Sequence, residues 1–296
     1  MHTVSTIAEL RQLTDTARCE GQTVGFVPTM GFLHAGHASL MAAARAETDL
    51  VVSSIFVNPL QFAVGEDLST YPRDLERDSA LAVEQGVDLL FIPAVEEMYP
   101  RSVVTEVAVP PLASKWDGAT RPTHFTGMAT VVAKLFNIVG PCRAYFGEKD
   151  FQQLRIVKRM VSDLSLPVQV VGCPIVREPD GLAMSSRNTY LEPAERRAGV
   201  VLRRALDEAL VAIDRGERDP ATVVTIMETI VRAEPLANLD YACLVDVETL
   251  DIPDTIEGEF RLLIAAQVGR PRLIDNDGGT VLPEGALMRG TEQWQN

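Results

Sequence analysis

Apolar and polar residues alternate along the first half of the chain in two repeating patterns. Short runs rich in β-branched and aromatic residues predict strands, and the segments between them carry apolar residues every three or four positions, which predicts helices. Leu50–Val57 is mostly apolar and is typical of a strand covered on both sides. The predicted strands are Thr23–Val27, Leu50–Val57, Val87–Ile92, Arg143–Phe146 and Val168–Val171, and the predicted helices are Gly36–Ala46, Pro72–Gln85, Thr126–Val139 and Asp150–Leu164.

Strands that alternate with helices predict βαβ units, and hence a parallel sheet with helices on both faces. The pattern changes near residue 188, where long helical segments are followed by two strands. The expected fold class is therefore α/β, with a Rossmann-like domain at 1–187 and a smaller α+β domain at 188–296, a candidate lid with a mobile polar tail beyond Gly278. The elements expected in the second domain are helices Glu192–Gly216 and Pro220–Ala233 and strands Leu239–Val247 and Phe260–Val268.

Composition narrows the functional classes. The 296 residues are 46% hydrophobic and 23% charged, which is ordinary for a globular protein. Lys and Arg number 27 against 41 Asp and Glu, and the net charge of −14 argues against broad binding of nucleic acid but not against a small anionic ligand. No apolar run approaches the ~20 residues of a membrane span, and the start has no signal-peptide pattern, so we expect a cytoplasmic protein without a membrane partner. The four scattered cysteines favour reduced thiols over disulfides or a metal site.

Two histidines stand three residues apart after the first predicted strand, in the segment PTMGFLHAGH. His34 and His37 lie where a helix begins, and helix N-termini bind phosphate readily. Gly31 and Gly36 let the backbone approach a ligand closely, and the two imidazoles add donors for phosphate oxygens. This HxGH placement resembles the signature of the nucleotidyltransferase superfamily, which indicates an enzyme that uses ATP at its α-phosphate. The absence of GxxxxGK[ST] argues against a P-loop kinase or ATPase.

A second polar cluster, FVNPLQF, spans the end of the next predicted strand. Asn58 and Gln61 can fix a small polar substrate without adding charge, and Phe62 and Met30 can wall an apolar part of it. A turn with a solvated glutamine explains the same residues equally well.

The segment FGEKDFQQ lies where the strand Arg143–Phe146 opens into a helix. Lys149 is a compact point charge suited to phosphate. Asp150 suits a ribose hydroxyl, Lys149 or Mg²⁺, although helix capping also explains it. Gln153 follows one turn later on the same helix face.

The segment REPDGLAMSSRN ends the first predicted domain. The hydroxyls of Ser185 and Ser186, the guanidinium of Arg187 and the amides of a turn make an anion cradle. The segment is similar to the KMSKS loop of class I aminoacyl-tRNA synthetases. A linker turn between domains also explains it, and both readings can hold because a mobile loop suits a lid.

Five segments together, PTMGFLHAGH, FVNPLQF, RPTHFTGM, FGEKDFQQ and REPDGLAMSSRN, resemble those of the pantoate–β-alanine ligase family. The resemblance spans most of residues 20–195 and weakens in the second domain. It implies that the carboxylate of pantoate attacks the α-phosphate of ATP, and that the amine of β-alanine then displaces AMP to give pantothenate. It also implies a homodimer, and Mg²⁺ that is held largely by phosphates and water.

The resemblance further implies roles for individual residues, with no protein residue assigned to the metal. The expected catalytic residues are His34, His37, Lys149 and Arg187. Pantoate is expected to contact Gln61, Gln153 and Met30, and β-alanine to contact Gln61 and Asn58. The expected nucleotide-binding residues are Met30, Gly31, Phe32, Leu33, His34, Ala35, Gly36, His37, Gly147, Glu148, Lys149, Asp150, Val176, Met184, Ser185, Ser186 and Arg187.

Two alternatives stay open at this point. A nucleotidyltransferase of the same superfamily would leave a nucleotide on its acceptor and would need no amine. A non-catalytic nucleotide sensor or RNA-binding relative would bind without reaction, but the net charge of −14 and the four candidate catalytic residues weigh against it.

Overall fold

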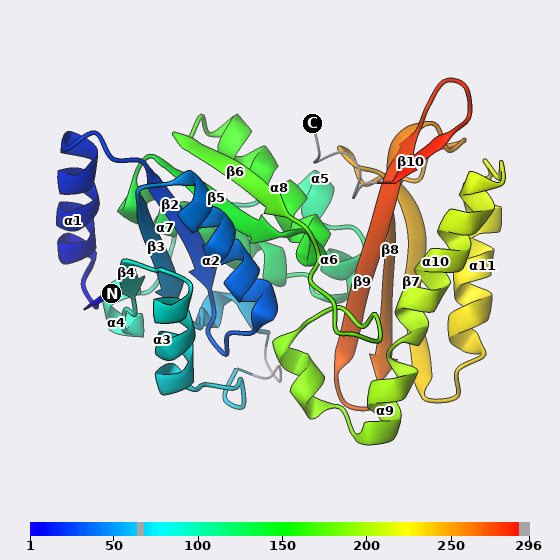
Figure 1. The fold of residues 1–296 in the computed structure, drawn as a ribbon, viewed down its shortest axis with the longest axis horizontal. Coiled ribbons are helices and arrows are strands. Elements are labelled where there is room, and N and C mark those ends of the chain that lie inside the picture. Colours follow the sequence, from blue (N-terminus) through cyan, green and yellow to red (C-terminus); the bar gives the residue numbers. More distant parts are fainter. Residues whose placement is uncertain (64–67, 290–296) are drawn as a thin grey trace. The chain divides into compact units, whose positions relative to one another are not determined.

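The computed structural model describes residues 1–63 and 68–289, and their contacts divide the chain into two units (Figure 1). The first unit comprises Met1–Glu148 and Gln152–Cys173, and the second comprises Lys149–Phe151 and the chain from Pro174 onward. The short segment Lys149–Phe151 is therefore grouped with the second unit although its sequence neighbours belong to the first. Residues 174–187 are also grouped with the second unit, and the expected domain division after residue 187 stays a prediction.

The first unit is built on a six-stranded parallel sheet, which confirms the predicted Rossmann-like α/β class. Its strands are β1 (His2–Val4), β2 (Val24–Thr29), β3 (Leu50–Ile55), β4 (Leu89–Phe91), β5 (Cys142–Gly147) and β6 (Val168–Cys173). They lie in the order β1-β4-β3-β2-β5-β6, so the chain turns to one side of β2 for β3 and to the other side for β5. The carboxyl ends of β2 and β5 thus border the point where the order reverses, which is where such sheets bind ligands.

Helices cover both faces of this sheet. Helices α1 and α7 contact each other and β2, whereas α2 contacts α3 and strands β2, β3 and β5. Right-handed crossovers place these two pairs on opposite faces. The helical elements are α1 (Ile7–Cys19), α2 (Ala35–Glu47), η1 (Pro59–Gln61), α3 (Leu75–Glu84), α4 (Val95–Met98), α5 (Pro110–Ala113), α6 (Asp117–Thr120), α7 (His124–Val139), η2 (Glu148–Asp150) and α8 (Phe151–Asp163).

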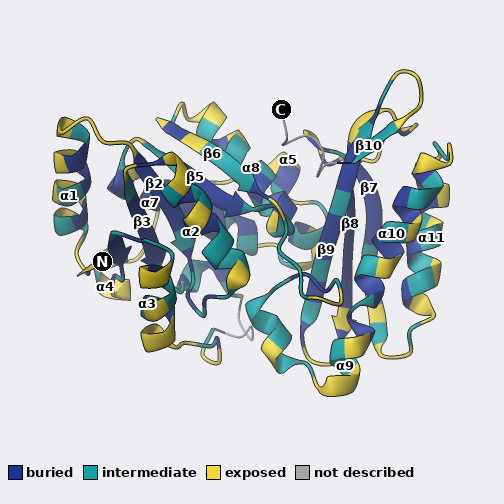
Figure 2. Cartoon of the chain, viewed as in Figure 1, coloured by how far each residue is buried: buried dark blue, intermediate teal, exposed yellow. Residues whose placement is uncertain are grey.

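The periodicity of α2 shows why the elements of the first half could be predicted from the sequence. Leu40, Met41 and Ala44, the residues expected on one face, are all buried against the sheet. Figure 2 shows β2 and β3 buried over almost their whole length, with exposed residues on the outer sides of the helices. Four of the six residues of β3 are buried, as expected for a strand covered on both sides. No helix among the described residues is long and apolar enough to cross a membrane.

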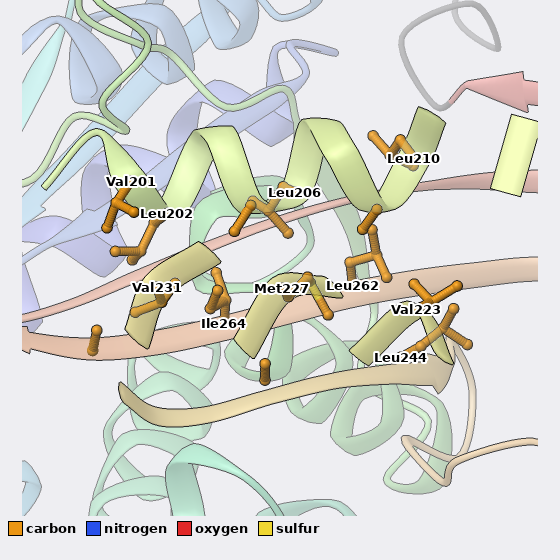
Figure 3. Close-up of a cluster of buried hydrophobic side chains, with 14 of the residues drawn as sticks. Val201, Leu202, Leu206, Leu210, Val223, Met227, Val231, Leu244, Leu262 and Ile264 are labelled. Carbon is orange, nitrogen blue, oxygen red and sulfur yellow. The ribbon is translucent and has the colours of Figure 1, made fainter. Parts of the chain in front are cut away.

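The second unit has an antiparallel sheet of four strands, in the order β10-β9-β8-β7, with helices packed on it. Figure 3 shows Leu206 of α10, Met227 of α11 and Ile264 of β8 directed into a shared core. This core confirms the small C-terminal α+β domain. The elements are η3 (Ser186–Tyr190), α9 (Pro193–Ala198), α10 (Val201–Asp214), α11 (Pro220–Arg232), β7 (Ala237–Asp246), β8 (Gly258–Val268), β9 (Arg272–Val281) and β10 (Leu287–Arg289).

Two expectations for the second unit were wrong. The single helix expected over Glu192–Gly216 is broken into α9 and α10 at Gly199, where a side chain would come within 3.0 Å of Leu273 Cδ1. The tail beyond Gly278 is not a mobile segment in the described residues, because it completes β9 and then pairs as β10. A Cβ at Gly278 would lie 2.3 Å from the carbonyl oxygen of Phe260, so the glycines that suggested mobility instead permit close strand packing.

Candidate functional site

The loop between β2 and α2 contains two successive residues with positive φ angles, a backbone conformation that few residues adopt. Gly31 has φ +82° and Phe32 has φ +50°. A Cβ at Gly31 would lie 2.9 Å from Ile55 Cγ2 and 3.1 Å from an oxygen of Asp78, so only glycine fits this position without displacement. The loop is therefore a shaped element held against β3 and α3.

The carboxylate of Asp78, on α3, holds this loop from behind. It accepts the N–H of Phe32 at 2.7 Å and the N–H of Leu33 at 2.6 Å. Its side chain is almost entirely buried, and burial raises the pKa of Asp78 despite the two hydrogen bonds. Sequence reasoning missed Asp78, although a signal existed, because a carboxylate shares the apolar helix face with Leu81 and Ala82.

Both histidines of the loop take part in capping α2. Nδ1 of His34, the N-cap residue, accepts the N–H of Gly36 at 3.1 Å, and Nδ1 of His37 accepts the N–H of His34 at 3.3 Å. With Nδ1 as the acceptor in each ring, the proton of a neutral imidazole lies on Nε2. The ring centroids are 4.1 Å apart. The loop thus presents two adjacent imidazoles of the same tautomer at the start of a helix.

The segment after β3 places Gln61 through a buried Asn58. The side chain of Asn58 has no exposed surface; its Nδ2 donates to Gln61 Oε1 at 3.1 Å and to the carbonyl of Gly127 at 3.1 Å. Its Oδ1 accepts the hydroxyl of Tyr99 at 2.8 Å and the N–H of Leu60 at 3.3 Å. Asn58 therefore orients Gln61, whose NH₂ end is the part not used in that contact. The expectation that Asn58 itself touches β-alanine stays a prediction.

Helix α7 fixes the same segment from the other side. A Cβ at Gly127 would lie 2.0 Å from the carbonyl oxygen of Leu60, so the backbones of α7 and η1 are in direct contact there. Nδ1 of His124 lies 3.1 Å from the carbonyl oxygen of Gln61. The motif RPTHFTGM thus contributes packing and backbone support for Gln61 in this structure.

Within the first unit, β5 ends at Gly147 and is followed by Glu148, next to the point where the strand order reverses. A Cβ at Gly147 would meet nothing within 4 Å. Gln153, on α8, is partly exposed, whereas its neighbour Gln152 is buried and donates to the carbonyls of Leu112 and Lys115 at 2.7 and 2.8 Å. Of the two glutamines, Gln153 is the one with surface to offer a ligand.

In the second unit, Lys149 has a mostly covered side chain whose Nζ lies 3.5 Å from Asp150 Oδ1. Its backbone carbonyl accepts a hydrogen bond of 2.8 Å from Asn276 Nδ2 of β9. Lys149 is therefore attached to the second unit through its main chain.

A short hairpin in the second unit leads into Met184–Arg187. Arg177 pairs with Ala183, the N–H of Met184 donates to the carbonyl of Val176 at 3.0 Å, and the turn closes at Gly181, which has φ +94°. Ser185 then caps η3, its hydroxyl accepting the N–H of Arg187 at 3.3 Å. The segment is thus an ordered turn and cap.

The predicted residues therefore fall into two groups. In the first unit Met30–His37, Asn58, Gln61, Gly147 and Glu148 follow the carboxyl ends of β2, β3 and β5, which meet at one edge of a parallel sheet, and Gln153 lies in the first turns of α8. The second unit carries Lys149, Asp150, Val176 and Met184–Arg187. Among the described residues, no group of three or more His, Cys, Asp and Glu side chains is placed to hold a metal ion.

Comparison with known proteins gives consistent matches. The family model described as pantoate-beta-alanine ligase matches residues 2–277. Pantothenate synthetase of Heliobacterium modesticaldum is 54% identical over 276 residues, which covers 93% of this chain and 98% of the relative. The relative from Sinorhizobium medicae is 54% identical over 93% of this chain and 95% of its own.

Solved structures agree with these matches. A pantothenate synthetase structure from Thermus thermophilus is 53% identical, covers 93% of this chain and 98% of that one, and has a TM-score of 0.89. A pantoate-beta-alanine ligase from Francisella tularensis, complexed with beta-gamma ATP and beta-alanine, is 33% identical with a TM-score of 0.76, over 93% and 97% of the two chains.

Proposed function

The chain belongs to the pantoate–β-alanine ligase family, and from that premise we propose how its residues join pantoate to β-alanine with ATP. The protein is an ATP-dependent ligase that forms the amide bond of pantothenate. In the first step a carboxylate oxygen of pantoate attacks the α-phosphorus, and pyrophosphate leaves. In the second step the amine of β-alanine attacks the acyl carbon, and AMP leaves with the oxygen that pantoate supplied.

The first step places growing negative charge on the phosphate oxygens, and a site accelerates it by fixing donors in advance. The observation that carries our assignment is that His34 and His37 both use Nδ1 to accept a backbone N–H. Each ring then offers Nε2–H as a donor, with its orientation set by the cap of α2. We assign these two donors to the triphosphate; His37 is also the candidate proton donor, a role that needs its ring protonated at Nδ1 too and hence the release of the hydrogen bond from the N–H of His34.

We propose Lys149 and Arg187 as the cationic ligands of the triphosphate. Lys149 supplies a compact positive charge and Arg187 a planar donor fork, both suited to phosphate. Ser185 and Ser186 add hydroxyls beside Arg187. Backbone contacts from the segments Met30–His37 and Gly147–Asp150, together with Val176 and Met184, complete the proposed nucleotide site.

The side chains proposed to hold pantoate and β-alanine are uncharged, unlike those proposed for the triphosphate. The orientation of Gln61 by Asn58 supports a role for Gln61 in holding pantoate and β-alanine. Gln153 and Met30 complete the proposed pantoate position. An amide and an apolar wall suit a small branched hydroxy acid, since they satisfy its polar groups without adding charge.

Three further properties complete the proposal. Mg²⁺ is expected to enter with ATP, because it keeps several waters and binds well through substrate phosphates. A homodimer is expected from the family resemblance, and a cytoplasmic location from the sequence pattern. Sedimentation of the purified chain tests the dimer directly.

One assay tests the proposed function. The purified protein is incubated with ATP, Mg²⁺ and pantoate, with and without β-alanine, and AMP and pantothenate are quantified. AMP that accumulates over many turnovers only when both substrates are present supports the ligase. A nucleotide left on pantoate without any need for an amine would indicate a nucleotidyltransferase, and binding without turnover would indicate a non-catalytic relative.

A further inference from the structure

Strand β9 carries two neighbouring polar residues, Asp275 and Asn276, that are almost completely buried. Burying a carboxylate and an amide is costly unless their polar atoms are hydrogen-bonded. Successive side chains of a strand point to opposite faces of the sheet, so the two residues serve different neighbours. The neighbours of Asp275 and the neighbours of Asn276 both belong to segments that we propose to contact the triphosphate.

Asp275 holds the hairpin that precedes Ser185–Arg187. Both its oxygens pair with the guanidinium of Arg177, at 2.7 and 2.9 Å. Arg177 also donates to the carbonyl of Gly181 at 3.0 Å, across the turn of the hairpin. A bidentate pair fixes the orientation of both partners, so the hairpin is set by β9.

Asn276 holds the main chain at Lys149. Its Nδ2 donates to the carbonyl of Lys149 at 2.8 Å, while its Oδ1 accepts Nε of Arg261 at 2.7 Å. Arg261 in turn lies over the ring of Phe151, 4.7 Å from its centroid. Arg261 thus fixes the rotamer of Asn276, and Asn276 fixes the carbonyl of Lys149.

We propose that Asp275 and Asn276 are a positioning pair, through which one strand sets both the backbone of Lys149 and the turn before Arg187. A lysine side chain is long and flexible, so the position of its charge depends on where its main chain is anchored. Displacement by about 1 Å can cost about 100-fold in rate when a group must meet a reacting phosphate. This inference rests on the proposed contact of Lys149 and Arg187 with the triphosphate.

The first test replaces Asn276 and follows single-turnover release of pyrophosphate at saturating ATP and pantoate. Asn276→Ala removes the hydrogen bond to Lys149, and we expect the rate to fall about tenfold. Asn276→Asp keeps the size and the acceptor for Arg261 but removes the donor, and we expect a similar loss. Gln267→Ala is the matched control, because Gln267 of β8 also donates its amide to a backbone carbonyl, that of Gly269 at 3.0 Å. An unchanged rate in both Asn276 variants would overturn the role.

A double-mutant cycle separates positioning from a general loss of stability. If Asn276 acts through Lys149, Asn276→Ala should lower the rate less than about twofold once Lys149→Ala is present. An equal fold-loss in both backgrounds overturns the proposal. The same cycle tests Asp275 through its partner Arg177. Arg177→Lys keeps the charge but loses the bidentate pairing, and it should lower the rate in the wild type more than in the Arg187→Ala background. Failure of the wild-type chain to form AMP would instead refute the proposed function, so the two failures are distinguishable.

Discussion

Replacing Asp78 by asparagine tests whether the HxGH loop must be held in its observed shape. The carboxylate accepts two backbone N–H groups, at 2.7 and 2.6 Å. Asparagine has nearly the same size but only one acceptor oxygen, and its NH₂ would face the second N–H. The variant therefore removes one contact of the loop and the ionisable group, with little change in size.

The magnitude follows from the contact that is lost. A hydrogen bond to a charged group contributes about 1.5–3 kcal/mol, and we take ~2 kcal/mol as the loss in loop anchoring. That corresponds to about a 30-fold lower rate of adenylation if the reaction needs the anchored loop.

The effect of Asp78→Asn on global stability should be smaller than its effect on rate. The folded-state pKa of Asp78 is raised, above the usual 3.8, by burial. Because the folded-state pKa is raised, the protonated carboxyl of Asp78 contributes to stability. That contribution is fully present below the unfolded pKa and is lost as pH rises through the folded pKa. Once the wild-type carboxyl is ionised it has lost that contribution, and asparagine avoids the buried charge, which offsets part of the lost hydrogen bond.

The assay compares single-turnover pyrophosphate release and thermal unfolding for the wild type, Asp78→Asn and Asp74→Asn. Asp74 caps the same helix by accepting the N–H of Arg77 at 3.1 Å, and asparagine caps helices equally well, so this control should retain wild-type behaviour. A wild-type rate in Asp78→Asn would refute the reasoning. The stability of the wild type should fall relative to that of Asp78→Asn as pH rises from 3.8, and the absence of such a fall would contradict the pKa argument.

The remaining predictions concern the proposed ligands and the packing that supports them. His37→Ala should lower pyrophosphate release by orders of magnitude with an intact circular dichroism spectrum, and a near-normal rate would remove His37 from the phosphate site. Gln153→Ala should raise the KM for pantoate more than the KM for ATP, and an unchanged pantoate KM would refute that assignment. Gly127→Ala places a Cβ 2.0 Å from the carbonyl of Leu60, so we expect about 1–3 kcal/mol of destabilisation and weaker pantoate binding through Gln61; normal unfolding in urea would contradict this. Met227→Ala should cost about 2–5 kcal/mol in urea unfolding, with the rate retained at 25 °C, because Met227 is buried in the core of the second unit.

The sequence predicted the layers of the first unit well because its helices have one apolar face and its inner strands are buried on both sides. The buried residues of α2 were named correctly, and HxGH, FVNPLQF and Gly147 fall at strand ends as expected. The edge strand β1 and helix α1 were not predicted. β1 has only three residues, and too few of them are apolar to give a periodic signal.

The parts that sequence reasoning missed depend on long-range contacts. The pairing of β9 at Gly278 needs the close approach of Phe260, which is distant in sequence, and a local pattern does not encode it. Likewise, Asp78 and Asn276 look like ordinary polar residues of a helix and a strand. Their importance appears only when the folded chain brings them to the backbone of Leu33 and Lys149.

The most direct test of the adenylate route uses pantoate labelled with ¹⁸O in both carboxylate oxygens. If the carboxylate attacks the α-phosphorus and the amine then attacks the acyl carbon, one labelled oxygen must leave with the nucleotide. Mass spectrometry should therefore find AMP with a single ¹⁸O and pyrophosphate with none. Unlabelled AMP, or ¹⁸O in orthophosphate with ADP as the nucleotide product, would contradict the account.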